Sequence, residues 1–216
     1  MKHLQQLNPE QLRSRLAERL SLAKPGRLAQ RAMAPALAYG RHHGPATATA
    51  RESAVLAALV PTAEGWRIPV VTRAASLRAH AGQVSLPGGS LEPGESPSEA
   101  ALREFAEEMG PELPFATIAG ELSSIFVFVS GFVIRPIVAV ADSPLQFQPS
   151  AAEVDRILLV PPESLESPQF RGMHLVQRRG LQFSAPCYLV EEQKIWGATC
   201  MILAELAAAL DDIARP

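Results

Sequence analysis

The chain has 216 residues, of which 47% are hydrophobic, and its formal net charge at pH 7 is −2. This composition supports a packed core without disulfide or metal staples, and the slightly acidic balance argues against broad nucleic-acid binding. The longest apolar stretch, residues 125–141, is broken by charged and turn-forming residues, and the N-terminus lacks an apolar signal core. We therefore expect a cytoplasmic protein that makes no membrane contact, with Cys187 and Cys200 as packed thiols in a reducing compartment.

The charge is unevenly divided along the chain. Residues 1–50 hold eight Lys or Arg and two Glu, whereas residues 51–216 hold twelve Lys or Arg and twenty Asp or Glu. This asymmetry predicts a basic N-terminal helix and arm, residues 1–50, followed by an acidic main domain, residues 51–216.

The first predicted element is a helix that begins after Asn8. Asn8 and Pro9 favour a capped helix start, and Leu12, Leu16 and Leu20 recur at four-residue spacing. This apolar stripe predicts a helix docked on the main domain.

An Ala-, Pro- and Gly-rich segment, residues 24–49, follows this helix. Such a composition predicts a linker or a loosely packed arm. His42 and His43 have no acidic neighbour there, so we expect solvent-exposed histidines rather than metal ligands.

Two short apolar runs, residues 54–60 and residues 68–72, are separated by Glu64 and Gly65. They predict two strands that form a hairpin or lie side by side. The next segment places basic and hydrogen-bonding side chains ahead of a glycine-rich loop that suits a phosphate, and a charged surface connection is the alternative. These residues are Arg73, Arg78, His80, Gly88 and Gly89.

A helix with defined ends is predicted over residues 97–109. Ser96 and Glu99 have capping-box spacing, Pro97 falls at the first helical position, and Gly110 suits a left-handed cap. On a helical wheel, one face is apolar and the opposite face is acidic and directed towards a cleft or water. The apolar face consists of Leu102, Phe105, Ala106 and Met109, and the acidic face consists of Glu104, Glu107 and Glu108.

Three neighbouring carboxylates repel one another unless a cation lies between them. Their oxygen atoms suit a hard divalent ion such as Mg²⁺ or Mn²⁺, and a solvated acidic surface is the competing interpretation. The residues of the helix alone leave both interpretations open.

The remaining elements are mostly strands. Residues 118–141 predict strands interrupted at Ser130 and Gly131, residues 156–160 predict another strand, and residues 170–190 predict two more. An apolar helix is predicted from Ile195 to Ile213, with five side chains suited to burial: Met201, Leu203, Leu206, Ala207 and Leu210.

The acidic helix and the loop before it resemble a known motif. The fixed positions of the Nudix box are matched by Gly89, Glu95, Arg103, Glu104, Glu107, Glu108 and Gly110, and Pro111 stands where an aliphatic residue is usual. The chain therefore resembles the Nudix hydrolases. The resemblance implies an α/β fold, the Nudix α/β/α sandwich with a mixed sheet between helices.

The segment ahead of the box resembles the coenzyme A pyrophosphatase branch of that family. The matching residues are Arg73, Leu77, Arg78, His80, Gly82, Val84, Pro87, Gly88 and Gly89. The departures are Pro69 and Val70 in place of leucines, and Val71, Ala74 and Leu86 in place of Thr, Ser and Phe. Arg73, Arg78, His80, Gly88 and Gly89 are accordingly the expected substrate-binding residues.

The resemblance also implies roles at the catalytic site. Glu104, Glu107, Glu108 and the Gly89 backbone are expected to hold Mg²⁺ or Mn²⁺, with Arg103 and Glu95 orienting the carboxylates. Glu153 is the candidate for a further metal ligand or the general base, and an ordinary surface acid is the competing interpretation.

The implied reaction is metal-dependent cleavage of coenzyme A or its derivatives to 3′,5′-ADP and 4′-phosphopantetheine. The alternative within the class is hydrolysis of ADP-ribose, NADH or another nucleoside diphosphate derivative. Two alternatives from other functional classes are a noncatalytic ligand sensor and an RNA-end hydrolase that uses the basic arm. The expected partner is a small molecule rather than nucleic acid or membrane, with a homodimer as one possible assembly.

Overall fold

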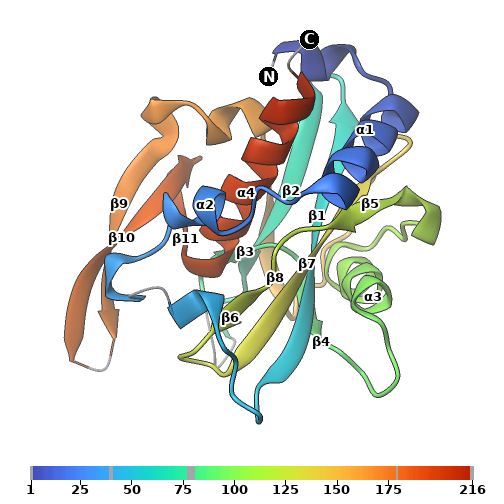
Figure 1. Ribbon diagram of the computed structural model, residues 1–216. Coiled ribbons are helices and arrows are strands. Elements are labelled where there is room, and N and C mark those ends of the chain that lie inside the picture. The colour runs from blue at the N-terminus through green and yellow to red at the C-terminus, as the bar shows by residue number, and fades with distance from the viewer. Residues whose placement is uncertain (1, 39–40, 77–80, 179, 215–216) are drawn as a thin grey trace.

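The computed structural model describes residues 2–38, 41–76, 81–178 and 180–214 (Figure 1). Its helices are α1 (Pro9–Leu22), α2 (Gly26–Arg31), α3 (Pro97–Met109) and α4 (Gly197–Ala214). Its strands are β1 (Arg51–Thr62), β2 (Gly65–Arg73), β3 (Val84–Ser85), β4 (Gly88–Ser90), β5 (Ile118–Glu121), β6 (Ile125–Val127), β7 (Phe132–Val140), β8 (Val154–Val160), β9 (Arg171–Arg178), β10 (Leu181–Val190) and β11 (Gln193–Trp196).

The central sheet is mixed. Its strand order is β3-β2-β1-β7-β5, and β4, β6 and β8 pair with β1, β7 and β2. The long pair β1 and β7 runs parallel, whereas the other pairs are antiparallel. The predicted hairpin around Glu64 and Gly65 and the predicted interruption at Ser130 and Gly131 are both confirmed, because β1 turns into β2 and β6 turns into β7 at these points.

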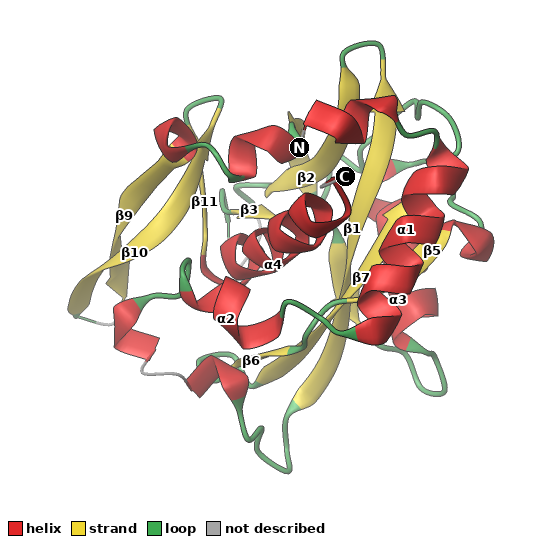
Figure 2. Cartoon of the chain, turned by 45° about the horizontal axis from the view of Figure 1, so that its top comes forward, coloured by secondary structure: helices red, strands yellow, loops and turns green. Residues whose placement is uncertain are grey.

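The two faces of the sheet carry separate cores because successive side chains of a strand point to opposite faces. On β1, Leu56 and Val60 pack in the core beneath α3, whereas Ala57 and Leu59 pack in the core beneath α1 and α4. Helices therefore cover both faces (Figure 2), and the predicted α/β/α sandwich with a mixed sheet is confirmed.

Helix α3 has the predicted ends. Ser96 and Glu99 form a reciprocal capping box, and Gly110 ends the helix with a φ of 98°. The predicted division of its faces is wrong in part, because Glu108 is buried beside Phe105 and Met109 while Leu102 and Ala106 are only partly buried. Residues 105 and 108 are one helical turn apart, so Glu108 lies on the same face as Phe105, and this face packs on the sheet.

Helix α1 docks on the main domain through the predicted stripe. Leu12 and Leu16 are fully buried and Leu20 nearly so, in the same core as Leu203 and Leu206 of α4. At the helix start, Asn8 and Gln11 form a reciprocal capping box. The N-terminal helix therefore contributes to the main core.

Replacing Leu16 by Ala is expected to lower the free energy of unfolding by about 3 kcal/mol, because it leaves a cavity in this core. Leu22→Ala is the matched control: Leu22 ends the same helix and is 78% exposed, so we expect a loss of less than about 0.5 kcal/mol. Urea unfolding of both variants measures the difference. Equal losses would contradict the docked position of α1.

The prediction of a linker or loosely packed arm over residues 24–49 is wrong for the part that contains α2 and η3, whereas residues 45–49 are exposed and lie outside helices and strands. Gln30 of α2 is fully buried, and its Nε2 donates to Glu205 Oε2 of α4 at 2.7 Å. The same carboxylate accepts from the backbone N–H groups of Gly26 and Ser123. These long-range hydrogen bonds satisfy a buried charge and fasten the arm, which local composition could not predict.

The prediction of solvent-exposed histidines in this arm is also wrong. The short 3₁₀ helix η3 (Arg41–His43) packs near β6, and it leaves His42 only 7% exposed and His43 partly buried. The two rings pack together with centroids 3.9 Å apart.

The C-terminal third differs from the prediction at one boundary. Ile195 and Trp196 belong to β11, which pairs with β10, and α4 begins only at Gly197. Strands β9, β10 and β11 form a separate antiparallel sheet beside α4 (Figure 1). The five predicted α4 side chains are buried, as are Cys187 and Cys200, whose thiols are free. Within the described part of the chain, no helix is long and apolar enough to cross a membrane.

Candidate active site

The candidate site forms where α3 crosses β4. Strand β4 pairs with β1 through Gly88 and Gly89, and this pairing brings the Gly88 N–H to Glu108. Glu108 Oε2 accepts that hydrogen bond at 3.2 Å, and Glu108 Oε1 lies 3.4 Å from an Arg73 Nη. The Glu108 side chain is 2% exposed, so these two donors face a carboxylate removed from water.

Burial raises the pKa of Glu108 to about 7, against the opposing effects of Arg73 and the Gly88 N–H. The neighbouring charges of Glu104 and Glu153 raise it further. The negative charge of Glu108 is therefore only partly compensated by the side chains around it.

Gly89 lies directly against the Glu104 carboxylate. A Cβ atom at position 89 would overlap both carboxylate oxygens of Glu104. The φ of Gly89 is not in the left-handed region, so close approach rather than backbone conformation requires glycine here.

Arg103 connects the carboxylates around this contact. Its guanidinium donates to both oxygens of Glu95, at 2.9 and 3.0 Å, and to Glu104 at 2.9 Å. It also donates to the Ser90 carbonyl at 3.2 Å and to the exposed Glu107 at 3.4 Å. The hydrogen bonds from Arg103 lower the pKa of Glu95, and the bidentate pair fixes the loop before α3 to the helix.

Comparison with known proteins decides the family. Residues 51–182 match the family model of the NUDIX domain. The chain belongs to the Nudix family. The Nudix hydrolase NudL of Photorhabdus laumondii is 35% identical over 137 residues, which cover 62% of this chain and 72% of the relative. NudL of Yersinia pestis is 31% identical over 163 residues, which cover 74% of this chain and 80% of the relative.

A solved structure agrees with the fold. A MutT/nudix family protein from Enterococcus faecalis superposes with a TM-score of 0.50 at 16% identity, over 80% of this chain and 67% of that one. The NUDIX domain and the NudL relatives show that the present chain is a Nudix pyrophosphohydrolase, of a family whose members generally use divalent metal ions and act on nucleoside diphosphate derivatives.

In this Nudix site, Glu153 lies near the buried carboxylate. It immediately precedes β8, whose Val154 pairs with Arg73, and its carbonyl accepts from the Ala74 N–H at 2.8 Å. The Glu153 residue is exposed, and its charge contributes to the raised pKa of Glu108. Two residues 45 positions apart in sequence therefore act on each other electrostatically.

The oxygen-rich donor set fits a hard divalent cation. Glu104 and Glu108 both reach the Gly88 and Gly89 segment, and a cation beside Glu108 would supply the missing compensation of its charge. Among the described residues, no three acidic, histidine or cysteine side chains converge closely enough to enclose an ion. The Arg103 guanidinium lies among Glu95, Glu104 and Glu107, and the Glu107 side chain is 59% exposed.

Of the predicted substrate-binding residues, Arg73, Gly88 and Gly89 meet at this site, and Arg78 and His80 lie outside the described residues. These three residues also line a pocket of about 710 Å³, whose lining includes residues of η3, β9, β10 and α4. The sequence patterns did not indicate this pocket, and they placed its histidine, His42, in solvent. No local pattern reveals it, because its walls come from segments far apart in the chain.

The pKa of Glu108 predicts how stability depends on pH in the metal-free protein. A folded-state pKa near 7, above the ordinary 4.5, contributes stability that is fully present below pH 4.5 and is lost as pH rises through 7. Between pH 5 and pH 8, the free energy of unfolding of the wild type should fall by roughly 2 kcal/mol relative to Glu108→Gln. Urea unfolding in a chelator, at both pH values, measures this difference, and parallel pH profiles for the two proteins would contradict the raised pKa.

Proposed function

We propose that the protein hydrolyses the diphosphate linkage of coenzyme A or its derivatives, giving 3′,5′-ADP and 4′-phosphopantetheine or its acylated form. The reaction class follows from the family, whereas the choice of coenzyme A as substrate goes beyond it. It is supported by the segment before the box, residues 73–89, and by the position of Arg73, which lies 3.4 Å from Glu108 and lines a pocket of about 710 Å³.

The observation that carries the site assignment is that two box glutamates contact Gly88 and Gly89 of β4. Glu108 accepts from the Gly88 N–H, and Glu104 lies against Gly89. We assign Glu104, Glu107 and Glu108, with the Gly89 backbone, to binding Mg²⁺ or Mn²⁺. Such an ion, when bound, neutralises charge on the diphosphate and acidifies water.

The other residues of the proposed site orient the metal ligands, contribute positive charge or accept a proton. Arg103 holds Glu104 and Glu95 in fixed orientations, so it acts on the metal ligands rather than on the substrate. Arg73, which lines the same pocket as Gly88 and Gly89, would contribute positive charge towards a phosphate oxygen. Glu153, exposed to water beside this cluster, is our candidate for accepting the proton of the attacking water.

A substrate panel tests the proposal. Coenzyme A, acyl-coenzyme A, ADP-ribose, NADH and diadenosine polyphosphates are each incubated with Mg²⁺ or Mn²⁺, and the products are identified by mass. We expect coenzyme A or its acyl esters to have the highest kcat/KM and to release 3′,5′-ADP. A higher kcat/KM for ADP-ribose or NADH would replace coenzyme A with that substrate. Intact diphosphates throughout would refute the proposed activity.

A further inference from the structure

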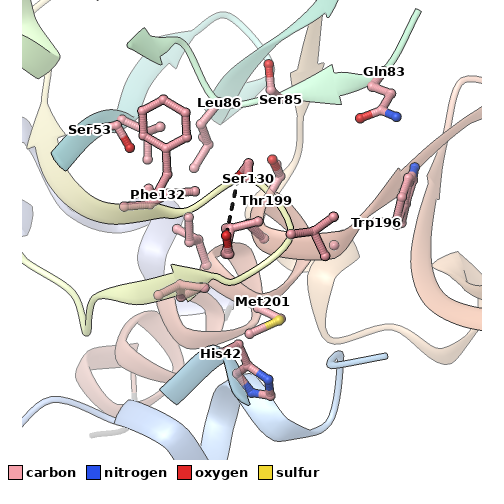
Figure 3. A pocket seen from close by; sticks show the side chains of 18 of the residues that line it. His42, Ser53, Gln83, Ser85, Leu86, Ser130, Phe132, Trp196, Thr199 and Met201 are labelled. Carbon is pink, nitrogen blue, oxygen red and sulfur yellow. Dashed lines mark hydrogen bonds between the residues drawn. The ribbon is translucent and has the colours of Figure 1, made fainter. Parts of the chain in front are cut away.

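The pocket beside the site continues well beyond the diphosphate-binding residues. Arg73, Gly88 and Gly89 line it where it meets the box glutamates, and Ala38 and His42 of the N-terminal arm also line it. In Figure 3, Ser85 and Leu86 lie on the opposite side of the pocket from His42, with Thr199 and Met201 between them. A ligand held at Gly88 and Gly89 can therefore extend towards the N-terminal arm at Ala38 and His42.

The walls along this path are mainly apolar. They come from β6, β7, β9, β10 and α4, and they include Phe126, Phe132, Ile134, Val176, Phe183 and Met201. Ribose, phosphate and adenine carry many polar groups that these walls would leave without partners. An extended aliphatic chain would instead bury its surface against them.

A few polar side chains interrupt the apolar walls, and two of them, His42 and Ser85, have buried atoms without hydrogen-bond partners among the described residues. Neither ring nitrogen of His42 has a hydrogen-bond partner in the described part of the chain, although the residue is only 7% exposed. The buried Oγ of Ser85 is likewise unpartnered among the described residues. Buried polar atoms of this kind ordinarily bind something, so they indicate where a ligand places its own polar groups.

His42 is suited to a neutral polar group. Burial lowers the pKa of His42 to about 4, and the nearby His43 and Arg27 lower it as well. At neutral pH one ring nitrogen therefore donates a hydrogen bond and the other accepts one. An amide offers both partners, and a thioester carbonyl accepts from the donor nitrogen.

We propose that this pocket binds the non-nucleotide arm of the substrate as an extended chain, with Ser85 and His42 hydrogen-bonding to amide or thioester groups along it. An acyl group at the end of the arm then covers apolar wall that a free thiol would leave in water. The substrate class is therefore an acylated coenzyme A rather than the free thiol. This inference rests on the proposed function.

Chain length provides the first test. The kcat/KM values of the wild type are measured with Mg²⁺ for coenzyme A, acetyl-coenzyme A and octanoyl-coenzyme A. Because each buried methylene favours binding by about three- to fourfold until the pocket is filled, octanoyl-coenzyme A should have a KM at least ~10-fold below that of coenzyme A. Equal KM values for the three would overturn the assignment.

Variants at the arm side of the pocket provide the second test. Ala38→Phe fills space there and should remove the preference for the octanoyl chain. His42→Phe keeps a ring but removes both hydrogen-bonding atoms, so KM for octanoyl-coenzyme A should rise about 3- to 10-fold at unchanged kcat. His3→Phe, at an exposed histidine outside the pocket, is the control and should change neither constant. If the two pocket variants, shown to be folded by circular dichroism, match the wild type, the assignment is overturned.

A binding measurement separates this inference from the proposed function. Trp196 lines the pocket, whereas the second tryptophan, Trp66, is buried elsewhere against Leu4. Octanoyl-pantetheine, which has no diphosphate, should change the tryptophan fluorescence of the wild type and bind at least ~3-fold more weakly to His42→Phe. Such binding without cleavage of any coenzyme A ester would support the pocket assignment and refute the proposed function. Cleavage of coenzyme A esters without such binding would support the proposed function and refute the pocket assignment.

Discussion

Glu107→Gln is expected to reduce kcat/KM for the preferred diphosphate substrate by roughly 10³-fold, equivalent to about 4 kcal/mol of transition-state stabilisation. The Glu107 side chain is 59% exposed, and its contact in the structure is a 3.4 Å ion pair with Arg103. The substitution therefore removes a proposed metal-binding carboxylate with little change in packing. Initial rates with saturating Mg²⁺ and a urea unfolding curve measure the two effects.

The control for this variant is Glu112→Gln. Glu112 is exposed just beyond the end of α3, so the substitution removes the same charge from the same region without changing a residue of the site. We expect activity within about twofold of the wild type and an unfolding change below about 0.5 kcal/mol. Near-wild-type activity in Glu107→Gln would refute the assignment of Glu107 as a metal ligand.

Gly89→Ala is expected to lower kcat/KM at least ~100-fold in a protein that still folds, because the new methyl group displaces the Glu104 carboxylate. The overlapping atoms belong to the far end of a flexible side chain, and the φ of Gly89 tolerates alanine. The Glu104 carboxylate can move aside, but it then loses its position beside Gly89 in β4. Steady-state kinetics and circular dichroism test both parts of this prediction.

Two further variants test whether Glu104 carries the effect of Gly89→Ala. Gly94→Ala, in the loop that follows β4 but with no atom within 4 Å of the new methyl group, should keep most of the activity despite the positive φ of Gly94. In a double-mutant cycle, adding Glu104→Ala to Gly89→Ala should cost less activity than Glu104→Ala costs alone. Independent, additive losses would show that the methyl group acts elsewhere.

Local sequence patterns predicted the elements whose cause is local. The capping boxes at Asn8 and Ser96, the helix end at Gly110 and the leucine stripe of α1 all depend on residues a few positions apart. The boundary at Ile195 was wrong for a tertiary reason. The apolar run suits a helix, but pairing with β10 keeps Ile195 and Trp196 in a strand.

The burial of Glu108 illustrates the limit of a helical wheel. The wheel places Glu108 on the same side of the helix as Glu104 and Glu107. The position of the sheet then decides which acids are covered, and β4 covers Glu108 while leaving Glu107 in water. The raised pKa of Glu108 follows from that burial and could not be inferred from the order of residues.

The sequence by itself determined the family motif, the reaction class that the motif implies and the helix that presents the acids, because each depends on fixed spacing within one short segment. Only the tertiary structure decided that Glu108 is buried, that the arm is fastened through Gln30 and Glu205, and that His42 lines a mainly apolar pocket. The physical reason is that burial, pairing and cavities arise between segments far apart in the chain. No single segment contains the information that sets them.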